Sequence, residues 1–247
     1  MGKAEWGSDA GHGARLGARG HESCCVAILA AGASARMGTC KLLLPFSGST
    51  LLRRAVEEAR RSCADEVVVV TGRYATAMRA TLADCGAREL ENRAWAEGQS
   101  TSVALAAAHA ARSGTARLLV MTCDQPFVDA SVINRMVSFA RRDVASGSPR
   151  LIHVAQVGTR RGNPCVFESP VYGLLERLEG DEGARSLMRA LPQLVAPVPM
   201  DGVPSLFDDV DTPGDFVRVE EAWEKSRRCA SMRDKVARSR LREGCVR

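Results

Sequence analysis

Short apolar runs alternate along the chain with longer amphipathic stretches. Six runs have the length of β-strands, and the runs at 25–30, 66–71 and 118–122 are almost continuous in small and branched apolar residues. Strands of this kind lie in the middle of a parallel sheet that is covered on both faces. The predicted strands are Cys25–Ala30, Glu66–Thr71, Ala87–Leu90, Leu118–Thr122, Leu151–Gln156 and Leu194–Pro197.

The stretches between the strands repeat their apolar residues with helical spacing. Thr50 is a suitable N-cap for the first of these helices, and Asp129 or Ser131 for the third. Strands that alternate with helices indicate βαβ units, so the pattern predicts an α/β fold with a doubly wound sheet in one domain. Beyond residue 142 the pattern loosens into a turn-rich join, a strand pair and two short helices. The predicted helices are Leu51–Cys63, Ser100–Arg112 and Ser131–Arg141.

The two ends of the chain differ from this domain. Residues 1–22 are rich in Gly, Ala and charge and lack the apolar core of a secretory signal, so we expect a disordered leader; a wrongly assigned start codon is the alternative. Residues 225–247 hold nine Lys or Arg against two acids, a net +7, which leaves −2 for the rest of a chain whose total is +5. We expect a single domain at 23–224 and a solvated, helical basic tail, with a nucleic-acid contact as the alternative role.

Composition narrows the class of protein. Hydrophobic residues make up 45% of the chain and charged residues 26%, and no apolar run is long enough to span a membrane. The nine cysteines are scattered, and none has the C-x-x-C spacing of a zinc or redox site. Free thiols in a reducing compartment are the simplest interpretation, so we expect a cytoplasmic protein.

A glycine-rich loop follows the first strand. Ala30, Ala31 and Gly32 are small enough to let the backbone approach a ligand, and backbone N–H groups in such a loop form an anion site. Arg36 and Lys41 follow, two cations within reach of a polyphosphate. The dinucleotide motif G-x-G-x-x-G is excluded because five residues separate Gly32 from the next glycine, and no lysine directly follows that glycine as a P-loop requires.

The segment from Leu29 to Pro45 resembles the signature L-x-A-G-x-S-x-R-M-G-x-x-K-x-L-L-P of the nucleotidyltransferases related to molybdenum cofactor cytidylyl- and guanylyltransferases. The resemblance implies a Rossmann-like nucleotidyltransferase fold, three-layered with a mostly parallel mixed sheet. It also implies that the backbone of Leu29, Ala30, Ala31 and Gly32 holds the base and ribose, while Arg36 and Lys41 bind the triphosphate.

Acidic residues follow two further apolar segments. The strand at 118–122 ends shortly before Asp124, which matches the magnesium ligand of the family. Asp209 and Asp211 match the family motif D-[IV]-D-T-P, which Thr212 and Pro213 complete. Magnesium takes one or two carboxylates plus substrate phosphates, so Asp124 with either Asp209 or Asp211 is the expected Mg²⁺ site. Capping of the following helices is the structural alternative for these acids.

Three other segments resemble the family in the expected order. The stretch 92–102 matches N-x-x-W-x-x-G-x-x-x-S, in which Gly98 and Ser102 are candidate nucleotide-binding residues and Trp95 suits packing equally well. The stretches 161–167 and 180–185 match R-G-x-P-x-x-F and G-D-x-G-A-R. Their candidate acceptor-binding residues are Arg161, Asn163, Asp181 and Arg185.

The resemblance, which spans about residues 26–223, implies a reaction in which Arg36, Lys41 and Asp124 are catalytic: a phosphate on a molybdopterin-type acceptor attacks the α-phosphorus of a nucleoside triphosphate and releases pyrophosphate. Ala31 stands where the guanylyl branch usually has glycine, which favours CTP over GTP. A molybdoenzyme or its chaperone is a candidate partner, and neither membrane nor nucleic acid is expected. The alternatives are a guanylyltransferase, a sugar- or alditol-phosphate nucleotidyltransferase, and a cofactor-carrying protein without catalysis.

Overall fold

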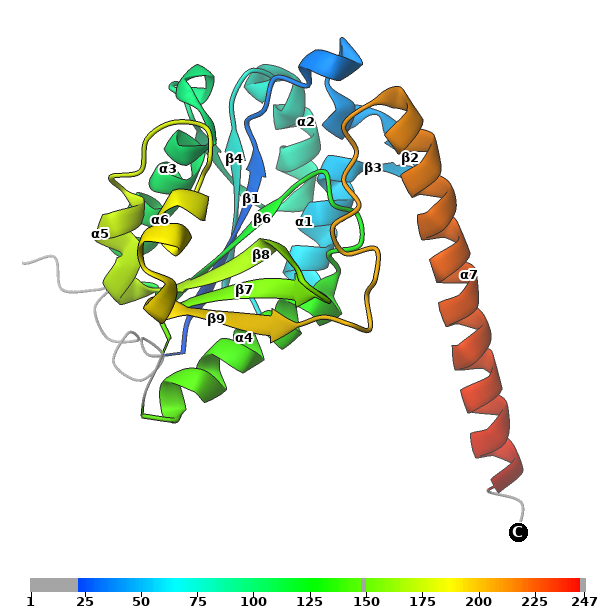
Figure 1. Cartoon of the computed structure of the whole chain (residues 1–247). Helices are drawn as coiled ribbons and strands as arrows, with labels where there is room; N and C mark the ends of the chain where they lie inside the picture. Colours follow the sequence, from blue (N-terminus) through cyan, green and yellow to red (C-terminus); the bar gives the residue numbers. More distant parts are fainter. Residues whose placement is uncertain (1–21, 148–149, 245–247) are drawn as a thin grey trace, which may run out of the picture.

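A mixed β-sheet forms the centre of the computed structural model, which describes residues 22–147 and 150–244 and side chains up to residue 228 (Figure 1). The strand order is β5-β4-β1-β6-β8-β7-β9, and β8 alone in this sheet runs antiparallel to its neighbours. A separate short hairpin pairs β2 with β3. The strands are β1 (Cys24–Ala30), β2 (Pro45–Phe46), β3 (Ser49–Thr50), β4 (Glu66–Thr71), β5 (Arg88–Glu91), β6 (Arg117–Thr122), β7 (Ile152–Val157), β8 (Arg160–Glu168) and β9 (Val195–Pro199).

Helices cover both faces of the sheet and complete three layers (Figure 1). The helices α1, α2, α4 and the first turns of α7 pack on one face, whereas α3, α5 and α6 pack on the other. Five short 3₁₀ helices lie in the connections, at Ala35–Met37, Lys41–Leu43, Trp95–Glu97, Ser169–Val171 and Pro192–Leu194. The α-helices are α1 (Leu51–Arg61), α2 (Ala75–Cys85), α3 (Gln99–Arg112), α4 (Ala130–Ala145), α5 (Tyr172–Leu175), α6 (Arg185–Ala190) and α7 (Pro213–Gly244).

The position of β1 between β4 and β6 explains why its sequence is apolar throughout. Alternate residues of a strand point to opposite faces, and both faces of this sheet are covered. Val26 and Ile28 therefore join the core under α1 and α4, while Cys25 and Ala27 join the core under α3, and all seven residues of the strand are buried. The predicted α/β class with a mostly parallel mixed sheet is confirmed.

The boundaries of the predicted elements lie close to those observed. Thr50 accepts a hydrogen bond from Arg53 N and caps α1, and Asp129 accepts one from Val132 N and caps α4. Helix α2 was not among the predicted elements, because its buried face consists of widely spaced residues among alanines and threonines. The predicted leader at 1–22 lies almost wholly outside the described residues. Helix α7 continues without interruption past residue 224, where the basic tail was expected to begin.

Helix α7 is fastened to the β2–β3 hairpin by its first turns. The Trp223 ring lies 5.6 Å from that of Phe46, centroid to centroid, and the Arg54 guanidinium stacks 4.0 Å from the Trp223 ring. Glu220 accepts a hydrogen bond from Ser47 N. In the described part of the chain, no helix has the length and apolar character required to cross a membrane.

The register of the central strands brings the functional loops together. Leu29 at the end of β1 pairs with Val70 of β4 on one side and Thr122 of β6 on the other. Cys123 N also donates a hydrogen bond to Leu29 O over 3.1 Å. The loops that follow β1 and β6 therefore leave the same edge of the sheet as neighbours, which is where open α/β sheets bind ligands.

Candidate functional site

The glycine-rich loop after β1 is held open by the loop between β4 and α2. Arg73 N donates to Ala31 O over 3.4 Å, and the Tyr74 hydroxyl donates to Ala33 O over 3.2 Å. The two loops touch at Gly72, where a Cβ atom would lie 2.6 Å from Ala31 O. Only glycine permits this approach, so the loop presents its backbone to the pocket instead of collapsing onto β4.

Lys41 connects this loop to the acidic residues. Its ammonium donates to Asp124 Oδ2 over 2.8 Å, to Asp211 Oδ1 over 3.0 Å and to Val210 O over 2.6 Å. The side chain is only 12% exposed. Burial by itself lowers the pKa of Lys41, but Asp124 and then Asp211 outweigh it, so the net shift is upward and the amine stays charged.

Arg36 contacts Asp211, one of the two acids that Lys41 binds. Its guanidinium lies 2.8 Å from Asp211 Oδ2 while 67% of the side chain remains exposed. Asp211 thus receives one cation on each carboxylate oxygen. Burial tends to raise the pKa of Asp211, but the hydrogen bonds and charges of Lys41 and Arg36 prevail and lower it. Residues 175 positions apart in the chain therefore meet.

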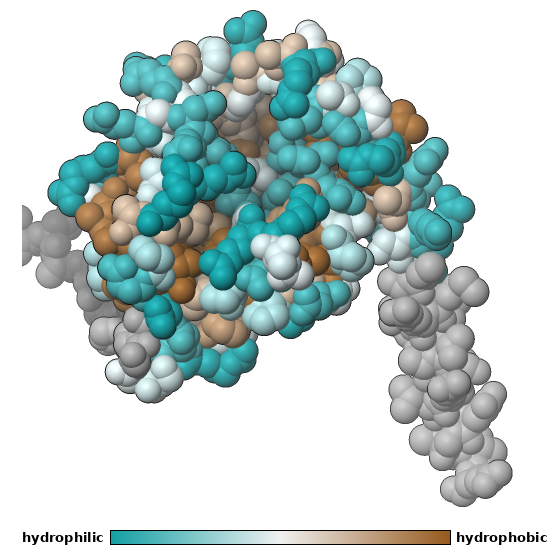
Figure 2. Space-filling view, in the orientation of Figure 1, coloured by the Kyte–Doolittle hydropathy of each residue, from teal (hydrophilic) through white to brown (hydrophobic). Residues whose placement is uncertain are grey.

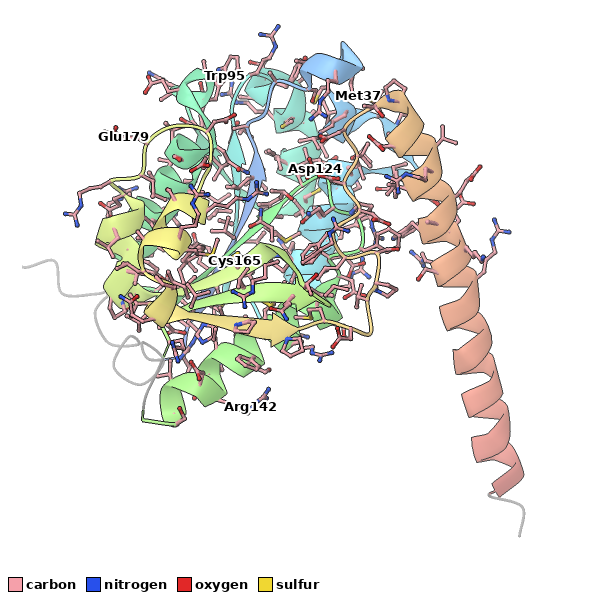
Figure 3. All side chains as sticks on the ribbon, viewed as in Figure 1. Met37, Trp95, Asp124, Arg142, Cys165 and Glu179 are labelled. Atoms are coloured by element: carbon pink, nitrogen blue, oxygen red, sulfur yellow. The ribbon has the colours of Figure 1, made fainter. Side chains whose placement is uncertain are left out.

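The surroundings of Asp209 shift its pKa in the direction opposite to the shift of Asp211. Burial, followed by the negative charges of Asp124 and Asp211, raises its pKa, with Lys41 opposing the shift. The capping role considered for these acids falls to Asp215, which accepts hydrogen bonds from the backbone N–H and hydroxyl of Thr212 at the start of α7. Asp209 and Asp211 therefore both face the site. Figure 3 shows the central position of Asp124 near the end of β6.

Two adjoining cavities meet at Asp124. The one beside the glycine-rich loop has a volume of about 890 Å³ and is lined by the whole segment 29–36, by Lys41 and Asp211, and by the 95–99 segment and Ser102. Its neighbour, of about 570 Å³, is lined by Asp209 and by strands β6, β7 and β8. Leu29, Gln99, Thr122, Asp124 and Arg185 line both cavities. Figure 2 shows that this face of the molecule is hollowed and that hydrophilic residues surround the hollow.

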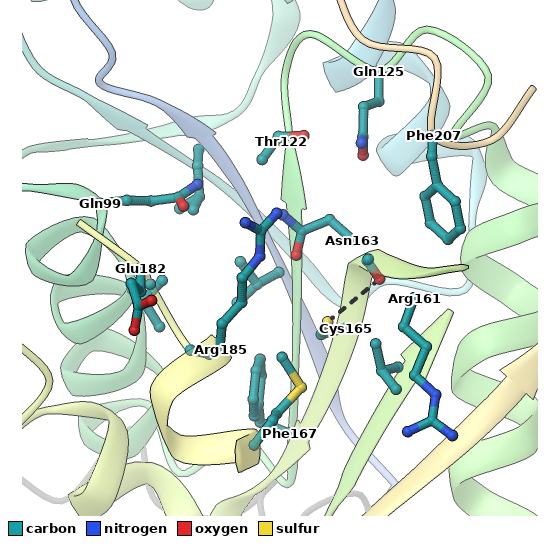
Figure 4. Close-up of a pocket in the computed structure, with 18 of the residues that line it drawn as sticks. Gln99, Thr122, Gln125, Arg161, Asn163, Cys165, Phe167, Glu182, Arg185 and Phe207 are labelled. Carbon is teal, nitrogen blue, oxygen red and sulfur yellow. Dashed lines mark hydrogen bonds between the residues drawn. The ribbon is translucent and has the colours of Figure 1, made fainter. Parts of the chain in front are cut away.

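The second cavity is lined by apolar side chains and by arginines. Val103, Val154 and Phe167 are among the apolar residues, and the lining also includes acids; the arginines are Arg160, Arg161, Arg185 and Arg189. Asn163 and Arg185 extend into this space, whereas Arg161 turns toward β7, where its Nε donates to Gln156 Oε1 over 2.8 Å (Figure 4). The cavity therefore suits a ligand with a flat apolar part and a negative charge.

Asp181 lies elsewhere than the sequence suggested. It lines the first cavity, not the second, and its Oδ1 accepts a hydrogen bond from Gln99 N over 3.2 Å at the start of α3. Gly98 makes this contact possible: its φ is +118°, and a Cβ there would lie 2.3 Å from Gly180 O. Segment 179–183 thus closes over the amino end of α3, from which Ser102 lines the same cavity.

Sequence reasoning missed several residues of the two cavities. Gln125 was quoted only as part of the sequence around Asp124, yet its amide extends into the second cavity and its Oε1 is buried without a partner among the described residues (Figure 4). Phe207 lies across from it, and Gln99 lines both cavities. The only sequence signal for these residues is their position next to Asp124, Asp209 and Gly98.

Known proteins resemble this chain over most of its length. Nicotine blue oxidoreductase of Paenarthrobacter nicotinovorans is 32% identical over 78% of this chain and 94% of the relative. The purine catabolism protein PucB of Bacillus subtilis is 29% identical over 79% of this chain and 95% of the relative.

Solved structures share the fold. Rv0371c of Mycobacterium tuberculosis matches with a TM-score of 0.67 and 31% identity, covering 81% of this chain and 97% of that one. Its complex with manganese matches with a TM-score of 0.64 and 29% identity, over 81% and 98%. The molybdopterin-guanine dinucleotide biosynthesis protein A of Archaeoglobus fulgidus, at 17% identity, a TM-score of 0.60 and coverage of 81% and 99%, shares the fold alone.

The family model described as the MobA-like NTP transferase domain matches residues 26–195, well over half of the chain. The match begins in β1 and includes the glycine-rich loop, Asp124 and most residues that line the two cavities, whereas Phe207, Asp209 and Asp211 lie beyond it. The chain therefore belongs to the MobA-like NTP transferase family, and it is a nucleotidyltransferase.

Proposed function

We propose that this protein transfers CMP from CTP to the terminal phosphate of a molybdopterin-type acceptor and releases pyrophosphate. The observation that carries the proposal is the meeting of Arg36, Lys41, Asp124 and Asp211 at the junction of two cavities. One cavity is lined by the glycine-rich loop together with Arg36 and Lys41, as expected for a triphosphate, and the other is lined by apolar residues and several arginines. Two substrates that react with each other need two such adjoining spaces.

The acidic residues are suited to a divalent ion, and a homologous structure contains manganese. In the described residues, Asp124, Asp209 and Asp211 are not among the groups of three ligands within 4.8 Å of one another. Magnesium, however, needs only one or two carboxylates besides substrate phosphates. The Lys41 ammonium between Asp124 and Asp211 indicates that this position attracts a cation. Asp124 with Asp209 is our preferred pair, because Asp211 already binds two cations; when bound, the ion supplies charge neutralisation at the phosphates.

The reaction requires positioning more than proton transfer. An oxygen of the acceptor phosphate forms a bond to the α-phosphorus while the bond from that phosphorus to the bridging oxygen breaks, and pyrophosphate leaves with the electron pair. The attacking phosphate is already ionised, so no general base is needed. Arg36 and Lys41 neutralise the charge that accumulates on the departing phosphates, and Arg185, which borders both cavities, is suited to orient the attacking one.

The preference for CTP depends on Ala31. This residue is 7% exposed and lines the cavity beside the glycine-rich loop. A methyl group narrows the space at this point, which favours the smaller pyrimidine base. A guanylyltransferase is the alternative for the same site, and in that case Ala31→Gly would leave nucleotide choice unchanged.

The deciding experiment measures pyrophosphate release with purified molybdopterin, Mg²⁺ or Mn²⁺, and each of CTP, GTP, ATP and UTP. We expect release with CTP, loss of at least about 100-fold in kcat for Asp124→Asn, and little change for the exposed control Asp84→Asn. Release that is faster with GTP would assign the guanylyl activity, and release only with sugar or alditol phosphates would move the acceptor to that class.

Two further outcomes would reject the proposal. Unchanged transfer by Asp124→Asn would remove the proposed catalytic role, and tight molybdopterin binding without transfer would favour a carrier. Because one relative is named an oxidoreductase, the same preparations should also be assayed for hydride transfer from nicotinamide cofactors. Redox turnover without pyrophosphate release would place this chain with that relative in activity.

A further inference from the structure

A second group of ligand-type side chains lies far from the proposed active site. Cys25, Glu66 and His109 each offer one atom, and these atoms all lie within 4.8 Å of one another. Cys25 is near the start of β1 and Glu66 begins β4, whereas Asp124 follows the end of β6. Since these strands are parallel, the group lies at the opposite edge of the sheet.

The fold directs all three side chains to one point. Cys25 and Glu66 are register partners on neighbouring parallel strands, so they point to the same face of the sheet. That face is covered by α3, whose buried positions include Ala106, Ala107 and Ala110. These small residues permit a close approach of the helix to the sheet, and His109 beside them reaches the strand pair.

The contacts are those of a partly open ligand set. His109 Nε2 lies 3.0 Å from each carboxylate oxygen of Glu66, and the Ser113 hydroxyl lies 3.5 Å from the same nitrogen. The side chain of His109 is 7% exposed and that of Glu66 is 31% exposed, while Cys25 is fully buried. An ion therefore has three inward ligands and a solvent-facing side at Glu66, where water can complete its coordination.

The three kinds of donor atom indicate which metal ion this group is suited to bind. Sulfur, imidazole nitrogen and carboxylate oxygen together are ligands for Zn²⁺ and similar borderline transition metals, which bind tetrahedrally at about 2.0–2.3 Å. Magnesium prefers an all-oxygen site such as the one at Asp124. A metal ion supplies the positive charge that stabilises the thiolate.

We propose that Cys25, Glu66 and His109 form a zinc-class metal site that ties β1, β4 and α3 together at the edge of the sheet remote from the nucleotide. The site is structural: the bound ion links two strands to a helix whose other end lines both active-site cavities. A His109–Glu66 hydrogen bond that binds no metal, with Arg88 Nη1 at 3.7 Å from Glu66 Oε1 as the pairing cation, is the competing explanation of the same contacts.

Cobalt(II) distinguishes the two explanations, because a thiolate ligand gives an intense near-ultraviolet charge-transfer band that carboxylate sites lack. Full-length protein is reduced, freed of metal, saturated with Mg²⁺ and titrated with Co²⁺. We expect a band that saturates at one equivalent, is lost in Cys25→Ser and Cys25→Ala, and is retained in Asp209→Asn. Absence of the band, or its persistence in Cys25→Ala, overturns the proposal, the latter because another cysteine must then be the ligand.

The affinity for zinc gives a second test, which uses a variant that leaves Cys25 in place. His109→Gln keeps a hydrogen-bond donor for Glu66 but removes the imidazole ligand, so we expect zinc affinity to fall at least roughly tenfold. Zinc should raise the melting temperature of the wild type and not that of His109→Gln. If both melt identically with zinc, the contacts are a hydrogen bond only; circular dichroism of the metal-free variants confirms that each is folded.

Discussion

At the scale of single residues, the most consequential arrangement is an ammonium group held between two carboxylates. Lys41 contacts both Asp124 and Asp211 and is only 12% exposed, so its charge compensates a pair of acids that would otherwise repel each other. Asp124 is also proposed to bind a divalent ion, together with Asp209. Lys41 and that ion therefore compete for Asp124, and release of Lys41 makes it available to the triphosphate.

We expect Lys41→Met to bind Mn²⁺ more tightly than the wild type when nucleotide is absent, because the competing ammonium is gone. The same variant should lose about 100-fold in kcat for nucleotidyl transfer, since a phosphate ligand is lost as well. Calorimetric titration with Mn²⁺ and a pyrophosphate-release assay measure the two effects. Lys225→Met, at an exposed position, is the matched control. Weaker Mn²⁺ binding by Lys41→Met would contradict the competition.

His153 gives a pH-dependent prediction for stability. Burial lowers the pKa of His153 below its usual 6.5, although the hydrogen bond that Asp143 accepts from the imidazole opposes the shift. As pH falls below 6.5, the unfolded chain binds a proton that the folded protein resists, so the free energy of unfolding decreases. Urea unfolding at pH 7.5 and 5.5 should reveal a larger loss for the wild type than for His153→Gln. Equal losses would show that His153 does not cause the effect.

The candidate residues that lie together in the structure are those in continuous motifs, and their catalytic and metal-binding roles stay predictions. Arg36, Lys41, Asp124 and Asp211 meet because each is next to an element whose hydrophobic pattern is clear in the sequence. Asp181 was assigned to the acceptor, yet it caps α3, and Arg161 turns to Gln156. Those two outcomes depend on how loops fold over each other in three dimensions, for which the spacing of residues along the chain contains no information.

At the scale of elements, the amino end of α3 depends on a close contact with another segment. Gly98 adopts φ +118° and lies against the carbonyl of Gly180, while Ser100 N donates to the same carbonyl over 3.1 Å. The helix start and the 179–183 segment therefore support each other beside the cavity that the glycine-rich loop borders. Neither helical propensity nor a capping motif in the sequence predicts this contact.

We expect Gly98→Ala to lower the free energy of unfolding by about 3 kcal/mol and to raise KM for the nucleotide, because the new methyl group displaces segment 179–183. Gly114→Ala is the matched control at the other end of α3: its φ is +64°, but no atom lies within 4 Å of a Cβ there. Urea unfolding and initial-rate kinetics measure both quantities. Similar effects of the two substitutions on KM would argue against a role for the contact in nucleotide binding.

The elements whose limits were predicted most accurately are those whose apolar residues differ most clearly from the sequence on either side. The continuous runs of β1, β4 and β6 identified the central parallel strands within one residue of their observed limits. Helix α2 was missed because its buried residues Ala75, Met78 and Leu82 are widely spaced among alanines and threonines, so the hydrophobic pattern has little contrast. Strand β8 was expected only as an unplaced member of a strand pair, and its bounds and direction were not predicted, since hydrophobic alternation is the same for both strand directions.

At the scale of the whole molecule, α7 packs against the domain next to the acidic residues of the site. It begins at Pro213, two residues after Asp211, and Trp223 fixes it to Phe46 and Arg54. The Asp209–Asp211 segment is therefore held at one end by Lys41 and at the other by this helix. The stability of the packing of α7 and the geometry of the site are therefore coupled.

We expect Trp223→Ala to lower the free energy of unfolding by about 3 kcal/mol, because the buried ring leaves a cavity and the Arg54 contact is lost. Chemical unfolding followed by circular dichroism measures the change. Trp95→Ala, at a half-buried position, should cost less and is the control. A loss well below about 1 kcal/mol for Trp223→Ala would mean that α7 contributes little to the stability of the domain.

The reversed direction of β8 gives the fold a modular character. Because β8 runs against β6, its first residues lie at the edge where β6 ends, and the β7–β8 hairpin supplies a cavity wall that the parallel strands do not. The glycine-rich loop lines only the first cavity beyond Leu29, and the hairpin lines only the second. Substitutions in β7 or β8 can therefore reshape the second cavity without touching the loop that follows β1.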